Sequence, residues 1–324
     1  MNRVGTALCA LFTGLLLILP LASLSLAQTW PQRSVRFILP LGPGSGTDIS
    51  ARLFADRLSA RWGQPVVVEN RPGGDGMIAI TAFIGAHDDH TLLFAPTSSF
   101  TAHPLLHDKL PYDPRELLPI ARVSNTLVVV AVPGSLQVGS LAELIALARA
   151  EPGKLNFTTA TGVTDFLFEA YFKSAAIAMT RVPYRDTVQA LNDLGEGRIQ
   201  AYVGALAIVQ PHVQSGRAKL IAITNSERPS IAPEIPTVAE AGYQALTFDG
   251  LVGLFGPRDL ANDIRERIAA DVRAVATDPV IVSRLGATGQ VVSPGTAIEF
   301  AASIEGQRAK AAAIGRELGI KLAQ

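Results

Sequence analysis

Residues 36–48 read Arg-Phe-Ile-Leu-Pro-Leu-Gly-Pro-Gly-Ser-Gly-Thr-Asp, and this stretch decides the fold class. A short apolar run typical of a buried strand leads into a glycine-rich loop. Apolar residues at helical spacing follow, namely Ile49, Leu53, Phe54 and Leu58. A strand, a bare loop and a helix N-terminus bring unpaired backbone N–H groups to one point, which suits a carboxylate or a phosphate. The alternative is a tight turn that binds nothing.

The same alternation continues along the chain. Apolar runs bounded by Gly and Pro alternate with amphipathic stretches, which predicts α/β layers with mainly parallel sheets. Strands are expected at 35–39, 66–69, 92–95, 127–132, 155–158, 180–182, 199–203, 220–224 and 251–254. Helices are expected at 47–61, 141–150, 165–175, 187–194, 260–276, 279–285 and 296–317.

Two apolar stretches, 126–133 and 246–257, are unusually long and are followed by Pro-Gly or Gly-Pro. We interpret them as the two crossings between domains. One lobe is then formed by residues 28–127 plus 251–324 and the other by residues 128–250. Ligands of open α/β sheets bind at the carboxyl ends of strands, and pockets favour domain interfaces. Both rules predict a cleft between the lobes.

The first 27 residues are typical of a secretory signal peptide. Arg3 precedes an apolar run and the small-residue ending Ser25-Leu26-Ala27, so cleavage is expected after Ala27. An uncleaved membrane anchor is the alternative, because the apolar stretch could nearly span a bilayer. The one cysteine, Cys9, lies in this segment, so the mature chain would contain no disulfide.

The charge balance of the mature chain favours no polyanionic partner. Removing Arg3 from 28 basic residues leaves 27, against 28 acidic residues, a net charge of −1. This balance gives no support for binding to nucleic acid or to a membrane surface. About 300 residues are enough to bury a core, most naturally as two domains.

Seven segments, in the correct order from Trp30 to the C-terminus, together resemble one family. These are 30–40, 42–48, 67–74 (Val-Val-Glu-Asn-Arg-Pro-Gly-Gly), 110–114 (Leu-Pro-Tyr-Asp-Pro), 152–157, 182–185 (Val-Pro-Tyr-Arg) and 234–242. The chain resembles the Bug family of extracytoplasmic solute receptors, the TctC-like binding proteins of tripartite tricarboxylate transporters.

The resemblance implies a type II-like periplasmic binding protein, with two Rossmann-like lobes around a central cleft. Such a protein captures a small organic carboxylate and delivers it to the membrane permease subunits of its transporter. The resemblance implies a monomer with no catalytic residue, cofactor or metal. A sensor that signals to a partner and an exported enzyme acting on an organic anion are the alternatives.

The resemblance also implies which loops bind the solute. One carboxylate would contact the loop after the first strand, and further contacts would come from a Ser/Thr-rich loop and from a small-residue helix start in the facing lobe. The expected contact residues are Gly42, Pro43, Gly44, Ser45, Gly46, Thr47, Asp48, Thr97, Ser98, Ser99, Thr159, Thr161, Gly162, Thr164, Tyr184 and Gly204.

Several of these residues also have plain structural interpretations. Thr161 or Thr164 could simply cap the helix that follows, and Ser98 and Ser99 could be ordinary turn residues. Tyr184 could point into the cleft or pack at the seam between lobes. Asp193 is interpreted as a structural hydrogen-bond acceptor.

The chain departs from the family pattern after the strand at 199–203. The family often has Asp and then Asn there, whereas this chain has Gly204 and Ala205. An acidic group would suit a ligand ammonium, so its absence predicts a solute that needs no ammonium group.

Two rival motifs are weak. A dinucleotide fingerprint needs G-x-G-x-x-G/A, and Thr47 occupies its last position. His87 and His90, and likewise His103 and His107, have spacings that can bind metal, but both pairs lie in polar loops. We expect solvated turn histidines. No Gly-x-Ser-x-Gly elbow occurs.

Overall fold

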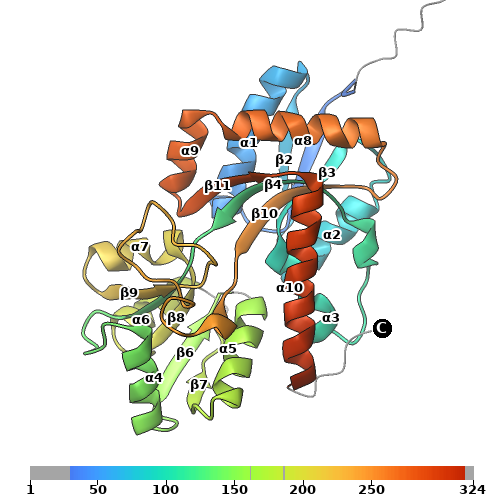
Figure 1. The fold of residues 1–324 in the computed structure, drawn as a ribbon. Helices are drawn as coiled ribbons and strands as arrows, with labels where there is room; N and C mark the ends of the chain where they lie inside the picture. Colours follow the sequence, from blue (N-terminus) through green and yellow to red (C-terminus); the bar gives the residue numbers. More distant parts are fainter. Residues whose placement is uncertain (1–29, 161, 185–186, 318–324) are drawn as a thin grey trace, which may run out of the picture. The chain divides into compact units, whose positions relative to one another are not determined.

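The computed structural model describes residues 30–160, 162–184 and 187–317, which contain two β-sheets flanked by helices (Figure 1). The first sheet has the strand order β11-β4-β10-β3-β1-β2. β1 pairs in parallel with β2 and β3, whereas β10 and β11 run antiparallel to their neighbours. Its strands are β1 (Val35–Leu39), β2 (Val66–Asn70), β3 (Thr91–Pro96), β4 (Leu118–Thr126), β10 (Gly250–Gly256) and β11 (Gln290–Gly295).

The second sheet has the order β7-β6-β8-β5-β9. β6 is parallel to β7 and β8, and β5 is antiparallel to β8 and β9. Both sheets are therefore mixed, and the expectation of mainly parallel sheets is wrong. The strands are β5 (Val128–Pro133), β6 (Leu155–Thr159), β7 (Met179–Arg181), β8 (Ala201–Ala205) and β9 (Ala218–Ile223).

Alternating residues of the first sheet pack against different helices. Phe37 and Phe94 pack with Phe54 of α1, while Ile38 and Leu93 belong to a core cluster with α2 and α10. Such alternation is what a strand buried on both faces requires. The helices that follow or contact these strands are α1 (Gly46–Trp62), α2 (Met77–Ile84), α3 (His103–Leu106), α8 (Asn262–Ala276), α9 (Pro279–Gly286) and α10 (Ala297–Glu317).

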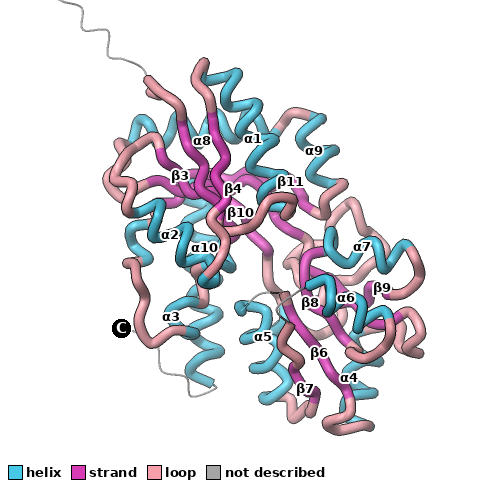
Figure 2. Tube along the Cα trace, turned by 180° about the vertical axis from the view of Figure 1, so that it is seen from behind, coloured by secondary structure: helices cyan, strands magenta, loops and turns pink. Residues whose placement is uncertain are grey.

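The helices of the second sheet are α4 (Leu141–Ala150), α5 (Gly162–Ser174), α6 (Thr187–Gly195) and α7 (Leu206–Gln214), traced from behind in Figure 2. Two core clusters contain the side chains of this sheet. Val130 and Phe157 pack with α4 and α5, and Val129 packs with Leu191 of α6 and Val209 of α7.

The chain passes between the sheets at two points. β4 continues into β5 with Leu127 alone between them. On the return, Phe248 packs in a cluster of the second sheet, whereas Leu251 packs in a cluster of the first. The domain limits at 127/128 and 250/251 stay a prediction.

The predicted signal peptide, residues 1–27, lies outside the described residues. Among the residues that the structure describes, no helix is long and apolar enough to cross a bilayer.

Candidate functional site

The loop after β1 is ordered by its own side chains. Ser45 caps α1, and its Oγ accepts a hydrogen bond from the Asp48 amide (3.2 Å). The Gly44 amide donates to Oδ2 of Asp48 (2.9 Å). Gly44 has a φ of 81°, a left-handed conformation that favours glycine. Asp48 therefore serves the helix start, and the glycine is required by the backbone.

Asp48 is almost fully buried and connects this loop to β2. Asn70 Nδ2 donates both to Asp48 Oδ1 and to the Leu41 carbonyl (2.9 Å each), and Arg52 pairs with the same carboxylate (3.0 Å). Burial alone would raise the pKa of Asp48, but the hydrogen bonds from Arg52, Gly44 and Asn70 together hold the pKa below its ordinary value. Asn70 belongs to the Val-Glu-Asn-Arg-Pro-Gly segment, so its place beside this loop explains part of that motif.

Two backbone N–H groups of the loop are left for a ligand. Among the described residues, no acceptor takes the amide hydrogens of Gly46 and Thr47 at the start of α1. A Cβ added to Gly42 would meet no atom within 4 Å, so the space beside that residue is open. The loop thus offers two backbone donors at Gly46 and Thr47 and open space at Gly42.

Gln290 of β11 joins this loop to β4. Its Nε2 donates to the Gly46 carbonyl, and its Oε1 accepts from Ser124 Oγ (2.6 Å). The preceding residue, Gly289, lies against the start of α7. A Cβ added to Gly289 would be 3.0 Å from the backbone nitrogen of Ala207. Residues 289–290 therefore contact both the loop after β1 and the N-terminus of α7.

The Ser/Thr loop after β3 forms η2 (Thr97–Ser99) and is largely buried. Thr97 Oγ1 donates to Gln307 Oε1 (2.7 Å), and Gln307 Nε2 donates to the Asp249 carbonyl (2.7 Å). A Cβ on Gly76 would lie 3.1 Å from Ser99 and 3.3 Å from Pro40. The loops after β1, β2 and β3 thus meet at one edge of the sheet. Ser98 is half-buried there.

The expected residues of the second sheet lie at or after the ends of its parallel strands β6, β7 and β8. Thr159 pairs with Val203, which places the end of β6 beside Gly204. Thr159 Oγ1 donates to Asp165, which also forms an ion pair with Arg181 (2.5 Å). The negative charge of Asp165 therefore already has a partner. Thr164 is buried, Gly162 starts α5, and Thr161 lies outside the described residues.

Gly204 is constrained by the residue two positions before it. A Cβ at Gly204 would lie 2.4 Å from the Tyr202 hydroxyl. The Tyr202 side chain therefore occupies the space that any larger residue at position 204 would need. The departure from the family pattern at Gly204 is therefore coupled to Tyr202. Tyr184 is half-buried, and its hydroxyl donates to Asp193 (2.7 Å), which confirms Asp193 as a structural acceptor.

Next to these loops lies a cavity of about 430 Å³ that sequence reasoning missed. None of the expected contact residues that the structure describes lines it, although Val163 follows Gly162 and Gln307 accepts a hydrogen bond from Thr97. The lining residues come from β4, β10, β11, α5 and α10, from the loop at Thr101 and from the segment 226–249. They include Thr101, Arg122, Asn125, Val163, Phe166, Asp249, Gln307 and Lys310. No short motif connects these positions in the sequence.

The cavity contains both cationic and acidic groups. Lys310 Nζ donates to the Thr247 carbonyl, and burial lowers the pKa of Lys310. Arg122 Nε donates to the Ser293 carbonyl (2.8 Å), and Asp249 accepts from Asn125 Nδ2 (2.8 Å). Lys310, Arg122 and Asp249 thus each already form a hydrogen bond within the protein.

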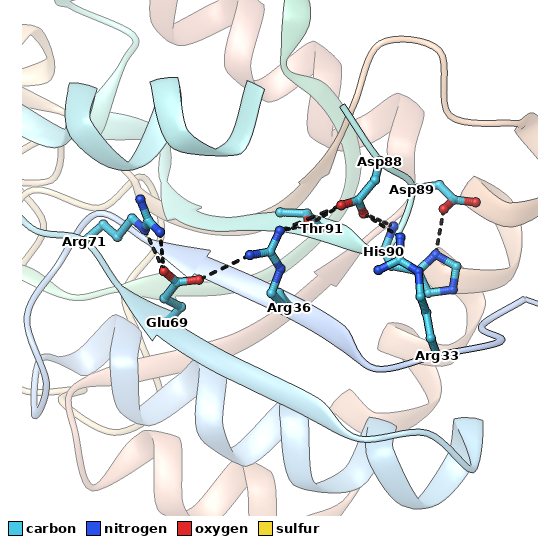
Figure 3. A network of polar contacts seen from close by, with 8 residues as sticks. All are labelled: Arg33, Arg36, Glu69, Arg71, Asp88, Asp89, His90 and Thr91. Carbon is cyan, nitrogen blue, oxygen red and sulfur yellow. Dashed lines mark hydrogen bonds and ion pairs between the residues drawn. The ribbon is translucent and has the colours of Figure 1, made fainter. Parts of the chain in front are cut away.

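Two of the four histidines, His90 and His103, differ from the expectation of solvated turns, whereas His87 is exposed as expected. His103 is fully buried and His90 nearly so. His90 Nδ1 lies 2.6 Å from Asp89 Oδ1, within the network of charged residues drawn in Figure 3. In that network Arg36 contacts both Glu69 and Asp88 (3.8 and 3.7 Å). These ion pairs connect the first three strands.

Two mixed sheets joined by two crossings, with glycine and hydroxyl loops at the ends of their parallel strands, define the class of two-lobed periplasmic binding proteins. Solved structures agree with this class. A structure described as a periplasmic transporter is 29% identical, covers 90% of this chain and 99% of its own, and superposes with a TM-score of 0.78. A Rhodopseudomonas palustris protein, MatC, with bound malate is 25% identical over 88% of this chain and 99% of its own, with a TM-score of 0.74.

Residues 50–320 match the family described as the tripartite tricarboxylate transporter family receptor, TctC. Protein BugT of Bordetella pertussis is 31% identical over 91% of this chain and 92% of its own length. A UPF0065 protein of Bordetella bronchiseptica is 30% identical over 87% of this chain and 84% of its own length. The chain belongs to the TctC receptor family, and the resemblance found in its sequence is confirmed.

Proposed function

We propose that this protein is a periplasmic receptor that captures a small organic carboxylate and delivers it to a tripartite tricarboxylate-type membrane transporter. The observation that carries the proposal is the pair of amides at Gly46 and Thr47 that have no acceptor among the described residues, in the same loop as the open space at Gly42. Backbone N–H groups at a helix N-terminus favour a carboxylate without any charged side chain. The signal peptide at residues 1–27 belongs to the same proposal.

The solute should need no ammonium group. Gly204 offers no acid, and Asp165, the acid nearest in sequence to the expected contacts on α5, is paired with Arg181. A buried ammonium without a partner costs several kcal/mol. The relatives solved with a named ligand support this preference, because adipate and malate are carboxylates without an amino group.

Calorimetric titration with adipate, malate and aspartate tests the proposal. We expect binding to at least one of the first two and little to aspartate. Gly42→Val should abolish that binding while the protein stays folded, because Gly42 borders open space. Gly139→Val, at an exposed glycine before α4, is the matched control. Equal affinity of the Gly42 variant and the wild type would show that the loop is only a turn.

Recovery of the solute separates a receptor from an exported enzyme. A receptor returns the solute unchanged after prolonged incubation, whereas an enzyme yields a product. A ligand at 100 times its dissociation constant should also stabilise the protein by about 2.7 kcal/mol, which a thermal melt detects.

A further inference from the structure

Three side chains of metal-ligating type meet at α3, and none of them is an expected carboxylate contact. Asp75, His103 and His107 each place one ligand atom within 4.8 Å of the others. His103 Nε2 lies 3.4 Å from Asp75 Oδ2, and His107 Nε2 lies 4.0 Å from the same oxygen. His103 is the first residue of α3, and His107 follows the helix at its C-cap. The two rings contact each other edge to face, with their centroids 5.5 Å apart.

His107 has a nitrogen whose hydrogen bonding is not satisfied by the protein. Its Nε2 is buried and, among the described residues, has no hydrogen-bond partner. Buried polar atoms nearly always have a partner, so an atom without one needs an explanation. This nitrogen lies 4.0 Å from Asp75 Oδ2, too far for a hydrogen bond.

His103 is oriented by a second residue in the way metal-bound histidines usually are. It is fully buried, and its Nδ1 lies 2.7 Å from the Tyr112 hydroxyl. His103 Nε2 lies 2.9 Å from the Asp75 carbonyl oxygen, which only accepts, so Nε2–H donates to it. Metal binding would therefore require the ring proton to move to Nδ1, from which it can donate to the Tyr112 hydroxyl. An outer partner on the second ring nitrogen fixes both tautomer and ring orientation of a metal ligand.

We propose that Asp75, His103 and His107 bind one divalent transition-metal ion, with Zn²⁺ as the representative ion. Imidazole and carboxylate together select zinc and its neighbours over Mg²⁺ and Ca²⁺, which prefer all-oxygen sites. Two ligands of a tetrahedral zinc ion lie roughly 3.4 Å apart. The separation of His103 and Asp75 already fits, and His107 has to approach Asp75 by roughly 0.6 Å.

The ion would connect two loops that are far apart in the sequence. Asp75 lies in η1 (Gly74–Gly76), whose Gly76 touches Ser99 and Pro40. Binding would therefore fix the loop after β2 to α3, directly beside the loop Thr97–Ser99. In a mature chain without disulfides, this would be a cross-link between separate segments.

Zinc titration of the mature protein without an affinity tag, in competition with a chromophoric chelator, tests the proposal. We expect one equivalent bound, a melting temperature raised by Zn²⁺ and no response to Mg²⁺. His107→Gln and Asp75→Asn should each abolish both effects. Both side chains are partly exposed (33% and 44%), so the variants should fold, which circular dichroism checks.

His87→Asn is the matched control, since His87 is an exposed histidine outside the cluster with a positive φ that asparagine tolerates. It should bind zinc as the wild type does. Wild-type affinity no tighter than that of the His107 variant would overturn the proposal. An equal loss in the His87 variant would overturn it too, because surface histidines would then explain the binding.

Discussion

At the scale of single residues, Tyr202 is a clear case of a polar group buried for a packing reason. Its ring fills the space above Gly204, and its hydroxyl has no hydrogen-bond partner among the described residues. Burial raises the pKa of Tyr202, so the hydroxyl stays neutral. The ring contributes apolar packing to the core, whereas burial of the hydroxyl without a hydrogen-bond partner is unfavourable.

We expect Tyr202→Phe to raise the free energy of unfolding by about 1 kcal/mol, because it removes an unsatisfied buried hydroxyl and keeps the ring. Tyr112→Phe is the matched comparison. Its hydroxyl is bonded to His103, so that variant should lose about 1 kcal/mol. Urea denaturation measures both, and a similar loss in the two variants would contradict this account of Tyr202.

At the scale of elements, the start of α1 depends on the charge of Asp48. The carboxylate accepts from Gly44, Asn70 and Arg52, and these contacts fix the loop after β1 to β2. The folded pKa is below the ordinary value, so Asp48 stabilises the fold above that value. This stabilisation is lost as the pH falls through the lowered folded pKa.

Asp48→Asn should lower the free energy of unfolding at pH 7 by about 1–3 kcal/mol, because a buried charged acceptor is lost. The difference from wild type should shrink as the pH falls below 3.8, the ordinary pKa of an aspartate. Denaturant titrations at several pH values measure it. Asp56→Asn, at an exposed position of the same helix, should change little, and a gap that stays constant into acid would refute the assignment.

Elements with strong local signals were predicted well. The helix at 141–150 matches α4, because Ser140 caps it through the Glu143 amide and its apolar residues repeat at helical spacing. β4 and β11 were missed. β4 starts Leu-Pro and contains Arg122, and β11 contains Ser-Pro-Gly, so neither has the apolar alternation of a strand. Both are strands because distant strands pair with them.

The candidate site was predicted only where one segment carries it. The loop 42–48 combines a strand, glycines and a helix start, all visible in the sequence. Gln290 lies 244 residues away from the Gly46 carbonyl that it binds, and no local pattern could connect them. The cavity, lined from β4, α5 and α10, was invisible for the same reason.

At the scale of the whole molecule, a solute that contacts loops of both sheets should favour a closed arrangement. Such a ligand shifts the equilibrium by its differential affinity for the two states. We expect the radius of gyration from small-angle scattering to fall when the solute saturates the protein. The Gly42→Val variant with the same solute should show no change. An unchanged radius in the wild type at saturation would contradict closure.

The position of β10 between β3 and β4 has a consequence for synthesis. A ribosome that has released residues 1–249 has supplied every strand of the second sheet, yet the first sheet still lacks the strand that joins β3 to β4. Apolar residues such as Leu93 and Phe94 then have no completed core to enter. Until its last quarter is made, the nascent chain is the kind of incomplete polypeptide that holding chaperones bind.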